Sequence, residues 1–430
     1  MRVIGIIAEF NPFHNGHGYL IKKARETVND PRAIVMPLIS GFFTQRGLPA
    51  ICPPSVRARQ ALLCGSDVVI ELPFSFACAP SSRFAEGAVS ELLSTGVVTD
   101  IAFGVDSGDT RLLEALAGTN FQDDEVFNKL LNSYISTGIS FPQARASAVR
   151  DYAKEKGITG DTGTLLSSPN SILALDYLLA INKLDRNKKL NVIMIKREGD
   201  AYNSSEVLSS MPSASSIRRI ITGTASGGYS RAAIASGLNG LMPDLSLGVM
   251  LASNSGGVFS FPDYLEYIRD CLNTAQVSPS LENIAYMSDD LAGYIRNFAG
   301  NIRPDTIPDD DHALKVFEEK ISTRRYTLTR IERALASMMT GQDKTVLDIK
   351  APPYIRVMGF NSEGKYCLKI MGKCSRIPVI SRPSDCLELQ SGNEPLKQIF
   401  GLDMKAASIG WKLYGRNTAT EWGSVPVIVK

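Results

Sequence analysis

Two histidines near the start of the chain, His14 and His17, have the residue type and spacing most suited to chemistry. They lie in the segment NPFHNGH, residues 11–17, and the 430-residue sequence contains only three histidines. At the start of a helix, residues three apart share one face, with about 5–6 Å between their Cβ atoms. The first helical turn also exposes backbone N–H groups and the positive end of the helix dipole. With Gly16 allowing close approach, the turn is a candidate phosphate-binding site. The alternatives are an ordinary surface pair or two ligands of a metal ion.

A second segment, SASSIR at residues 213–218, places hydroxyls and a guanidinium at the start of another expected helix. Serine at a helix start first suggests a structural cap, because its side chain accepts from backbone amides. The hydroxyls of Ser213 and Ser215 can also donate to phosphate oxygens, and Arg218 adds a bidentate cation. A polyphosphate needs contacts at both ends. The two segments together therefore favour an ATP site over a simple cap, with both histidines and Arg218 as catalytic donors.

A third group of basic residues lies later in the chain, in a stretch expected to be helical. Between Ser322 and Thr340, Glu332 is the only acidic residue in the sequence that offsets the positive charges of this group. A solvated basic face is the default interpretation of such a run. The functional interpretation is a track for RNA phosphates with Tyr326 available for base stacking. The arginines of this candidate RNA-binding group are Arg324, Arg325, Arg330 and Arg333.

The elements that position these residues follow from the apolar pattern. Short, β-branched apolar runs alternate with helical stretches, which predicts an α/β fold with a Rossmann-like parallel sheet. These runs are at residues 3–8, 33–39, 68–74, 101–105 and 191–197. We expect a nucleotide-binding domain over 1–225, a mainly helical region over 226–350 and an α/β segment over 351–430. In the last segment, YIRVMGF, KYCLKIM and IPVIS are expected strands, forming either a small domain or a return to the first sheet.

Composition narrows the class of protein. The net charge of +2 gives no general attraction to nucleic acid, so any basic surface must be local. The seven cysteines include no CxxC pair, which argues against a zinc knuckle and for free thiols in a reducing compartment. No segment reaches the about 18 consecutive apolar residues of a membrane helix. The sequence therefore predicts a soluble, cytoplasmic protein without a structural metal site, and it carries no signal for an oligomeric state.

Motifs along nearly the whole chain resemble those of one family. The NPFHNGH turn and the Ser-x-Ser-x-Ile-Arg segment are similar to the HIGH-type nucleotidyltransferase superfamily. Within it, the ordered set of motifs resembles the tRNA(Met) cytidine acetate ligase family. These motifs are IIAEFNPFHNGHGYLI, SGFFTQRGLPAI, DVVIELPF, RFAEGAV, IAFGVDS, PNSILALDYL, IKREGDAY, TRRYTLTRIERAL and PYIRVMGFNSEGK. Several motifs in a fixed order are more specific than any one of them.

The resemblance implies a two-step reaction. ATP and acetate would give acetyl-adenylate and pyrophosphate, and the acetyl group would pass to N4 of the wobble cytidine in elongator methionine tRNA. Activation is needed because the lone pair of the cytosine amine is delocalised into its ring. In the first step the acetate carboxylate meets the ATP phosphates, and both are anions. Clustered hydrogen-bond donors would offset their repulsion, and Mg²⁺ is expected on the polyphosphate.

By the same resemblance, ATP would be bound by residues 7–20 and by residues from four later segments. The later residues are Gly104, Asn170, Arg197, Ser213 and Ser215, for which a turn, a helix cap or a solvated charge are the alternatives. The early residues are Ile7, Ala8, Glu9, Phe10, Asn11, Pro12, Phe13, His14, Asn15, Gly16, His17, Gly18, Tyr19 and Leu20.

The chain departs from the family pattern after the second expected strand. Gln45, Arg46 and Gly47 should face the same crevice, but Leu48 stands where an acid is expected. The pair at 53–54 is Pro-Pro, where an Asp-Lys-like pair is expected. Two other interpretations stay open: a small-molecule adenylyl- or cytidylyltransferase, and a non-catalytic RNA-binding relative. The long chain after Arg218 argues against the first, and the intact catalytic donors argue against the second.

Overall fold

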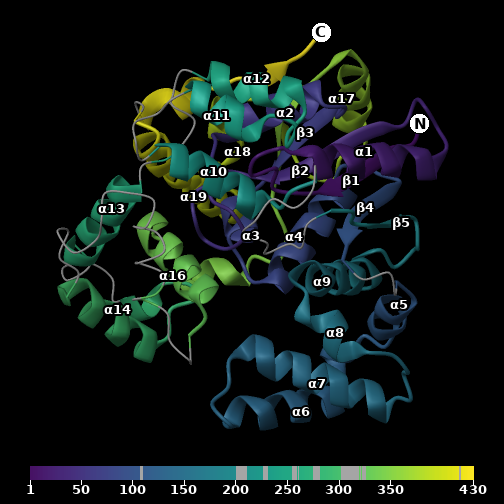
Figure 1. Ribbon diagram of the computed structural model, residues 1–430, viewed down its shortest axis with the longest axis vertical. Helices are drawn as coiled ribbons and strands as arrows, with labels where there is room; N and C mark the ends of the chain where they lie inside the picture. The colour runs from purple at the N-terminus through teal and green to yellow at the C-terminus, as the bar shows by residue number, and fades with distance from the viewer. Residues whose placement is uncertain are drawn as a thin grey trace.

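A mostly parallel sheet runs through the centre of the molecule, as Figure 1 shows for the computed structural model. The structure describes residues 1–106, 110–199, 211–225, 231–253, 259, 261–274, 281–301, 319, 321, 326–415 and 418–430. The strand order is β5-β4-β1-β2-β3-β6-β7, and β8 pairs with β6. The strands are β1 Val3–Ile7, β2 Ile34–Ser40, β3 Val68–Leu72, β4 Asp100–Val105, β5 Asn191–Lys196, β6 Ile355–Phe360, β7 Val379–Ile380 and β8 Val427–Ile428. The five expected N-terminal strands are confirmed.

Both faces of the sheet are covered by helices, and every residue of β1, β2 and β3 is buried, which explains why these strands are mostly apolar. Alternate residues point to opposite faces. Ile4 and Ile6 pack with the buried sides of α1 Asn15–Val28 and α2 Pro54–Leu63. Val3 and Ile7 pack into the larger core, with α4 Ser81–Ser94 and α9 Pro169–Leu184. The remaining helices of this half are α3 Phe74–Ala77, α5 Thr110–Gly118, α6 Glu125–Ser136, α7 Phe141–Glu155 and α8 Thr162–Ser167.

The middle of the chain is helical, as expected. Its helices are α10 Ala214–Ala225, α11 Arg231–Leu238, α12 Asp244–Ala252, α13 Phe261–Thr274, α14 Asp289–Asn301 and α16 Leu328–Thr340. The helix α12 lies against α2, where Gln60 Nε2 donates to the carbonyl of Ser246 at 3.0 Å. In Figure 1, α13, α14 and α16 form a separate group beside the sheet.

The C-terminal segment returns to the first sheet. Strand β6 pairs antiparallel with β3, and β7 and β8 pair parallel with β6. Its helices are α17 Ser362–Cys374, α18 Cys386–Leu389 and α19 Glu394–Leu413. The strand expected at KYCLKIM was wrong, because these residues form the middle of α17. Cys367 and Met371 are buried while Lys365 and Lys369 are exposed, a helical spacing that a seven-residue window did not distinguish from a strand.

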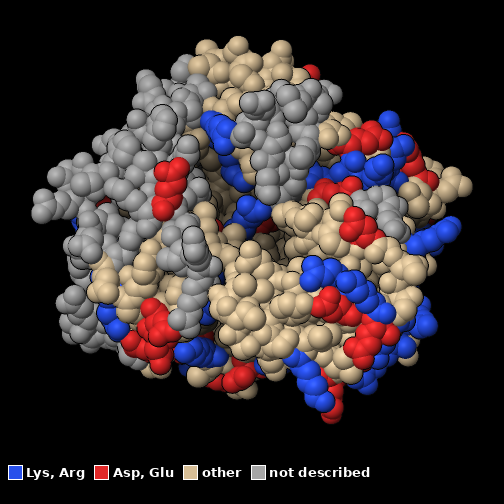
Figure 2. Space-filling view, turned by 60° about the horizontal axis from the view of Figure 1, so that its bottom comes forward, with Lys and Arg blue, Asp and Glu red and all other residues tan. Residues whose placement is uncertain are grey.

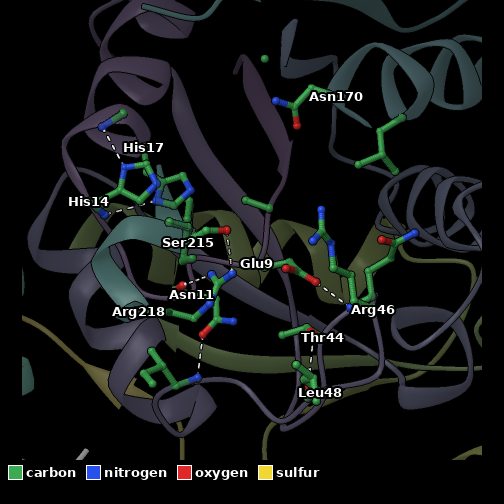
Figure 3. A pocket seen from close by; sticks show the side chains of 18 of the residues that line it. Glu9, Asn11, His14, His17, Thr44, Arg46, Leu48, Asn170, Ser215 and Arg218 are labelled. Carbon is green, nitrogen blue, oxygen red and sulfur yellow. Dashed lines mark hydrogen bonds between the residues drawn. The ribbon is translucent and has the colours of Figure 1, made fainter. Parts of the chain in front are cut away.

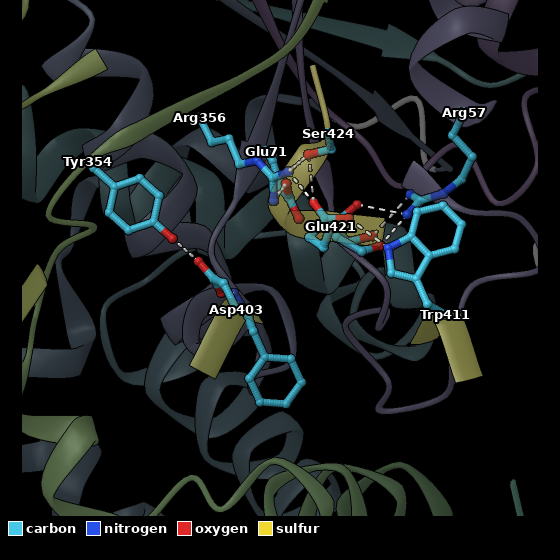
Figure 4. A network of polar contacts seen from close by, with 11 residues as sticks. Arg57, Glu71, Tyr354, Arg356, Asp403, Trp411, Glu421 and Ser424 are labelled. Atoms are coloured by element: carbon cyan, nitrogen blue, oxygen red, sulfur yellow. Dashed lines mark hydrogen bonds and ion pairs between the residues drawn. The ribbon is translucent and has the colours of Figure 1, made fainter. Parts of the chain in front are cut away.

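Buried polar contacts attach this C-terminal segment to the N-terminal strands of the sheet (Figure 4). Arg356 in β6 pairs with Glu71 in β3 at 3.1 Å and with Glu421 near the end of the chain. Glu421 also accepts from Trp411 Nε1 at 2.8 Å. Each charge in this buried network has at least one partner of opposite sign, which offsets part of the cost of removing it from water. The network therefore specifies how β6 docks beside β3.

The chain order of the strands creates one switch point. Strand β1 pairs with β2 on one side and with β4 on the other, all parallel. In open α/β sheets, ligands bind beyond the carboxyl ends of the strands at such a point. The turn containing His14 follows β1 directly, and so lies at this edge. Among the described residues, no helix is both long and apolar enough to cross a membrane.

Candidate active site

A cavity of about 1120 Å³ opens at the carboxyl edge of the sheet, between the ends of β1, β2, β4 and β5 and the helices α10, α13 and α16. Figure 2 shows a hollow with Lys or Arg side chains on its walls. The charged residues that line the cavity are Glu9, Arg46, Arg197, Glu198, Arg218, Arg219 and Glu332. A volume above the usual range of about 300–1,000 Å³ for small-molecule sites suits a nucleotide together with a second substrate.

A buried arginine fixes the loops that form the floor of the cavity. Arg57 in α2 is fully buried, and its guanidinium donates to the carbonyl of Glu9 at 2.7 Å, after β1. It also donates to the carbonyls of Ser40 at 2.9 Å and Gly41 at the end of β2, and to that of Cys52 at 3.1 Å. Burial lowers the pKa of Arg57. One cation therefore bonds to carbonyls of three segments, after β1, at the end of β2 and before α2.

The two histidines stack at the start of α1, with ring centroids 3.8 Å apart (Figure 3). His14 is the N-cap of the helix, and its Nδ1 accepts from the backbone N–H of Gly16 at 3.1 Å. The Nδ1 of His17 accepts from the backbone N–H of His14 at 3.2 Å. Together these bonds form a reciprocal capping box, built from two imidazoles.

Electrostatics keep both imidazoles neutral. Burial, reinforced by the charges of Arg197 and Arg218, lowers the pKa of His14 to about 3. Burial and the neighbouring His14 hold the pKa of His17 well below its ordinary value. In a neutral imidazole one nitrogen accepts and the other carries the proton. Because each Nδ1 accepts, each Nε2 carries the hydrogen. The pair therefore contributes N–H donors and not positive charge.

The backbone N–H groups of the first turn of α1 are not available to a phosphate, contrary to the prediction. The N–H of Asn15 donates to the carbonyl of Leu241 at 3.3 Å, and that of Gly16 donates to His14. The N–H of His17 donates to the carbonyl of His14 at 2.9 Å. Capping by His14 and docking of the α11–α12 connection satisfy these groups.

The second predicted segment, residues 213–218, contacts the histidine turn, although Arg218 and its partner Asn11 are 207 residues apart in the sequence. Arg218 Nη1 donates to the carbonyl of Asn11 at 2.9 Å, and its Nη2 donates to Ser215 Oγ at 3.1 Å. Both Ser215 and Arg218 line the cavity. Ser213 is fully buried outside the lining, and its Oγ accepts from the N–H of Ser216 at 3.0 Å. Ser213 therefore caps the start of α10, while Ser215 and Arg218 face the cavity.

Gly104, Asn170 and Arg197 also line the cavity, from β4, α9 and the end of β5. Arg197 pairs with Asp106 at 3.2 Å, and Asn170 Nδ2 donates to the same carboxylate oxygen at 2.8 Å. These residues, predicted from three distant motifs, therefore form one cluster opposite the histidine turn, as the position of Asn170 in Figure 3 shows.

Residues 7–20 divide between the cavity and the core. Pro12 and Phe13 are buried outside the lining, and Asn15 and Gly18 also lie outside it. Their position indicates that they shape the turn. Those that line the cavity are Ile7, Ala8, Glu9, Phe10, Asn11, His14, Gly16, His17, Tyr19 and Leu20.

The segment after β2 faces the same cavity, as expected for Gln45 and Arg46. The N–H of Gln45 donates to Glu9 Oε1 at 2.6 Å, and Leu48 packs against the main core at the cavity wall. Gly47 has φ of 109°, and a Cβ there would lie 2.4 Å from the backbone of Glu332. Glycine is therefore required for α16 to approach. Pro54 starts α2, a position that suits proline, so the Pro-Pro departure preserves the helix.

Of the predicted RNA-binding arginines, Arg330 and Arg333 lie in the described part of the chain, both in α16. Arg324 and Arg325 lie outside the described residues. Burial lowers the pKa of Arg333, whose Nε finds no hydrogen-bond acceptor in the described part of the chain. Tyr326 is only 6% exposed, and the guanidinium of Arg330 lies 5.1 Å from its ring centroid. The expectation that Tyr326 stacks on a base was wrong, because its ring is part of the core.

Two residues important to the site were missed in the sequence. Arg57 occupies the buried face of α2, four residues before the buried Ala61, an unusual place for a cation. Asp106 is the first polar residue after the apolar strand β4, at the edge where ligands bind. Both positions could have been suspected from these patterns. Their partners could not, because they come from segments far apart in the sequence.

No metal centre built from protein side chains is present in the described residues, since no group of three or more His, Cys, Asp or Glu could hold an ion. The free cysteines are Cys52, Cys64, Cys78, Cys271, Cys367, Cys374 and Cys386.

The parallel sheet, the stacked histidines after β1 and Arg218 opposite them define a HIGH-type nucleotidyl transferase. A family model described as HIGH Nucleotidyl Transferase matches residues 1–422. The tRNA(Met) cytidine acetate ligase of Acetivibrio thermocellus is 33% identical over 417 residues, 95% of this chain and 94% of that protein. That of Caldicellulosiruptor saccharolyticus is 37% identical over 380 residues, 85% and 84% of the two chains. The chain therefore belongs to the tRNA(Met) cytidine acetate ligase family.

Solved structures agree over the full length. The crystal structure of Thermotoga maritima TmcAL in its apo form I has a TM-score of 0.86, with 27% identity and 100% of both chains covered. A second structure of that protein, bound with alpha-thio ATP, has a TM-score of 0.84, with 26% identity and the same coverage.

Proposed function

We propose that this protein activates acetate with ATP as acetyl-adenylate and acetylates N4 of the wobble cytidine of elongator tRNA(Met). The observation that carries the proposal is the contact between Arg218 and the Asn11 carbonyl. It joins the two motifs of a HIGH nucleotidyl transferase into one cavity, in a chain that matches the acetate ligases over nearly its whole length. The proposed ATP contacts are the residues of 7–20, Gly104, Asn170, Arg197, Ser215 and Arg218 that line the cavity.

In the first step, a carboxylate oxygen of acetate attacks the α-phosphorus of ATP. The bond from that phosphorus to the bridging oxygen breaks, and pyrophosphate leaves. Two anions meet in this reaction, so donors aimed at the phosphate oxygens supply the main stabilisation. The Nε2–H groups of His14 and His17 and the guanidinium of Arg218 are these donors. Because the histidines are neutral and held by their capping bonds, they need no reorganisation as negative charge develops.

In the second step, the cytidine N4 attacks the acetyl carbonyl carbon. The bond between that carbon and the phosphate oxygen breaks, AMP leaves, and N4 loses one proton. The extension of the cavity toward α13 and α16 offers room for the base beside the nucleotide. Aromatic side chains there, Phe259 and Phe261, suit a nucleobase because aromatic faces stack on bases.

Mg²⁺ would enter the cavity bound to the polyphosphate of ATP. Mg²⁺ is typically held by one or two carboxylates and substrate phosphates, and Glu9 is a lining carboxylate next to the histidine turn. The donor set fits that arrangement and not an all-protein cage. When bound, the ion would offset part of the phosphate charge.

The three regions have separate roles in this proposal. Residues 1–225 bind ATP, 226–350 contact the tRNA, and 351–430 complete the sheet. A cytoplasmic location is part of the proposal, because it would bring the enzyme together with its proposed tRNA substrate.

The proposal is tested by exchange of labelled pyrophosphate into ATP without tRNA, with and without acetate. Acetate-dependent exchange, followed by transfer of labelled acetate to tRNA(Met), is the expected result. Exchange that requires another acid or a phosphate ester would instead indicate a small-molecule nucleotidyltransferase. The absence of exchange under all conditions would favour a non-catalytic RNA-binding relative.

A further inference from the structure

Asp106 follows β4 directly and is not among the residues that line the cavity, but it contacts two that do. Its carboxylate accepts from residues of two other elements. Oδ1 accepts from Asn170 Nδ2 at 2.8 Å and from Arg197 Nη1 at 3.2 Å. Oδ2 accepts from Ser168 Oγ, at the N-cap of α9. One side chain thus connects β4, α9 and β5 at the edge of the sheet.

The contact with Asp106 determines which way the Asn170 amide points. A carboxylate only accepts hydrogen bonds, so the amide nitrogen must face it. The Oδ1 of Asn170 then lies on the opposite side of the amide group. Asn170 lines the cavity, and so it can present an acceptor there to an N–H or O–H of a nucleotide.

The same carboxylate fixes the direction of Arg197. The backbone N–H of Arg197 donates to the carbonyl of Val105 at 2.9 Å, which places the residue beside β4. A Cβ at Gly104 would lie 3.2 Å from Arg197 Cγ, so the glycine leaves room for the arginine stem to cross the strand. The side chains of Arg197 and Asp106 are each about a quarter exposed, so water partly screens the ion pair. The pair therefore orients the arginine but contributes little to the stability of the fold.

We propose that Asp106 is a positioning residue for the nucleotide, which acts by holding Asn170 and Arg197 in the orientation that binds ATP. The proposal rests on the assignment of the cavity to ATP. Without the carboxylate, the amide can rotate and the guanidinium can turn toward solvent. Part of the binding free energy of ATP is then used to order these two side chains.

The test compares Asp106→Asn with Asp100→Asn by titration calorimetry with ATP. Asp100 lies at the opposite end of the same strand and also pairs with an arginine, Arg2. Asp106→Asn is expected to raise the Kd for ATP about tenfold, by analogy with the loss of residues that orient metal-binding side chains. It should leave the thermal unfolding midpoint nearly unchanged, and Asp106→Glu should recover part of the affinity. Asp100→Asn should lower the unfolding midpoint and leave the Kd within about twofold.

A double-mutant cycle separates positioning from any independent role. In a variant that carries Asn170→Ala and Arg197→Ala, adding Asp106→Asn should change the Kd by less than about twofold, because its targets are gone. An unchanged Kd for Asp106→Asn alone, or an equal tenfold loss in the double-variant background, overturns the proposal. Because calorimetry needs no turnover, these outcomes are independent of whether acetate supports pyrophosphate exchange.

Discussion

The backbone N–H of His14 donates to Nδ1 of His17 at 3.2 Å, so the first residue of the pair determines the tautomer of the second. His14 is itself fixed by the N–H of Gly16. The hydrogen bonds at the start of α1 therefore orient two imidazoles. In the proposed site, their Nε2–H groups have the anion-binding role that backbone groups have at other helix N-termini.

Removal of one such donor should slow the chemistry and leave the fold intact. We expect His17→Ala to reduce pyrophosphate exchange about 100-fold, the usual effect of losing a donor to a developing negative charge. His17→Gln should recover part of the rate, because its amide offers an N–H at a similar reach. Lys22→Ala, on the exposed side of the same helix, serves as the control. Equal rates for His17→Ala and the control would show that the pair has another role.

The low pKa of His14 gives a pH dependence with a definite sign. The imidazole titrates at about 3 in the folded protein and near 6.5 in the unfolded chain. The unfolded state therefore binds more protons as the pH falls below 6.5. Stability from His14 is complete above 6.5 and is lost progressively toward pH 3.

Denaturant unfolding at several pH values should show this loss, and His14→Gln should reduce it. Exchange rates corrected for folded protein should show no histidine titration between pH 6 and 8. A rate that falls with an apparent pKa of 6–7 and is abolished in His14→Gln would contradict a permanently neutral pair.

Arg57 should matter for both stability and activity, although it touches no substrate in the proposed site. Arg57→Met leaves buried carbonyls without donors, so we expect a loss of about 3–5 kcal/mol in the free energy of unfolding. Exchange should also fall, because the loops after β1 and β2 lose their common anchor. Arg59→Met, on the exposed side of α2, should change stability by less than about 0.5 kcal/mol. Similar denaturation midpoints for the two variants would refute the anchoring role.

Glu91 in α4 should be a source of instability at neutral pH. Both carboxylate oxygens are buried and accept no hydrogen bond within the described residues. Burial, with the charges of Asp403 and Glu71, holds the pKa of Glu91 well above 4.5. The folded state thus keeps a proton that the unfolded chain releases, so stability falls as the pH rises above 4.5. Glu91→Gln should therefore stabilise the protein by about 1–3 kcal/mol at pH 7.

The gain from Glu91→Gln should disappear near pH 4, where both states of the wild-type side chain are protonated. Urea denaturation at pH 4 and pH 7 provides the comparison. A gain of the same size at both pH values would mean that packing and not ionisation is responsible.

Arg330 and Arg333 lie on one helix but should affect tRNA binding differently. The guanidinium of Arg330 lies 5.1 Å from the ring centroid of Tyr326. The Nε of Arg333 is buried, and burial lowers the pKa of that arginine. Arg330→Gln should reduce the slope of log K against log salt by about 0.7, the value for one phosphate contact on single-stranded RNA. Arg333→Gln should lower stability and leave the slope unchanged. Filter binding over a range of salt tests both, and an unchanged slope for Arg330→Gln would remove α16 from the RNA interface.

The sequence predicted the parallel sheet well because its five parallel strands are short, mostly apolar runs between clear turn signals. It also placed the histidine turn, since that site is local. The return of β6 to the sheet was one of two alternatives, because no local pattern specifies the partner of a strand. The misassigned strand in α17 and the buried ring of Tyr326 have one cause. The pattern of an amphipathic segment shows that one of its faces is polar. Which of its residues are buried depends on the tertiary neighbours, which the local sequence does not specify.

The position of β6 beside β3 has a consequence for biosynthesis. The ribosome completes β3 at Leu72 and reaches Ile355 only 283 residues later (355 − 72). At about 5–20 residues per second, that interval is roughly 15–60 s. Throughout it, the outer edge of β3 has no partner from this sheet, and such an edge can pair with another chain. The edge of β3 therefore stays open in the nascent chain and is covered only when the last strands of the protein have been made.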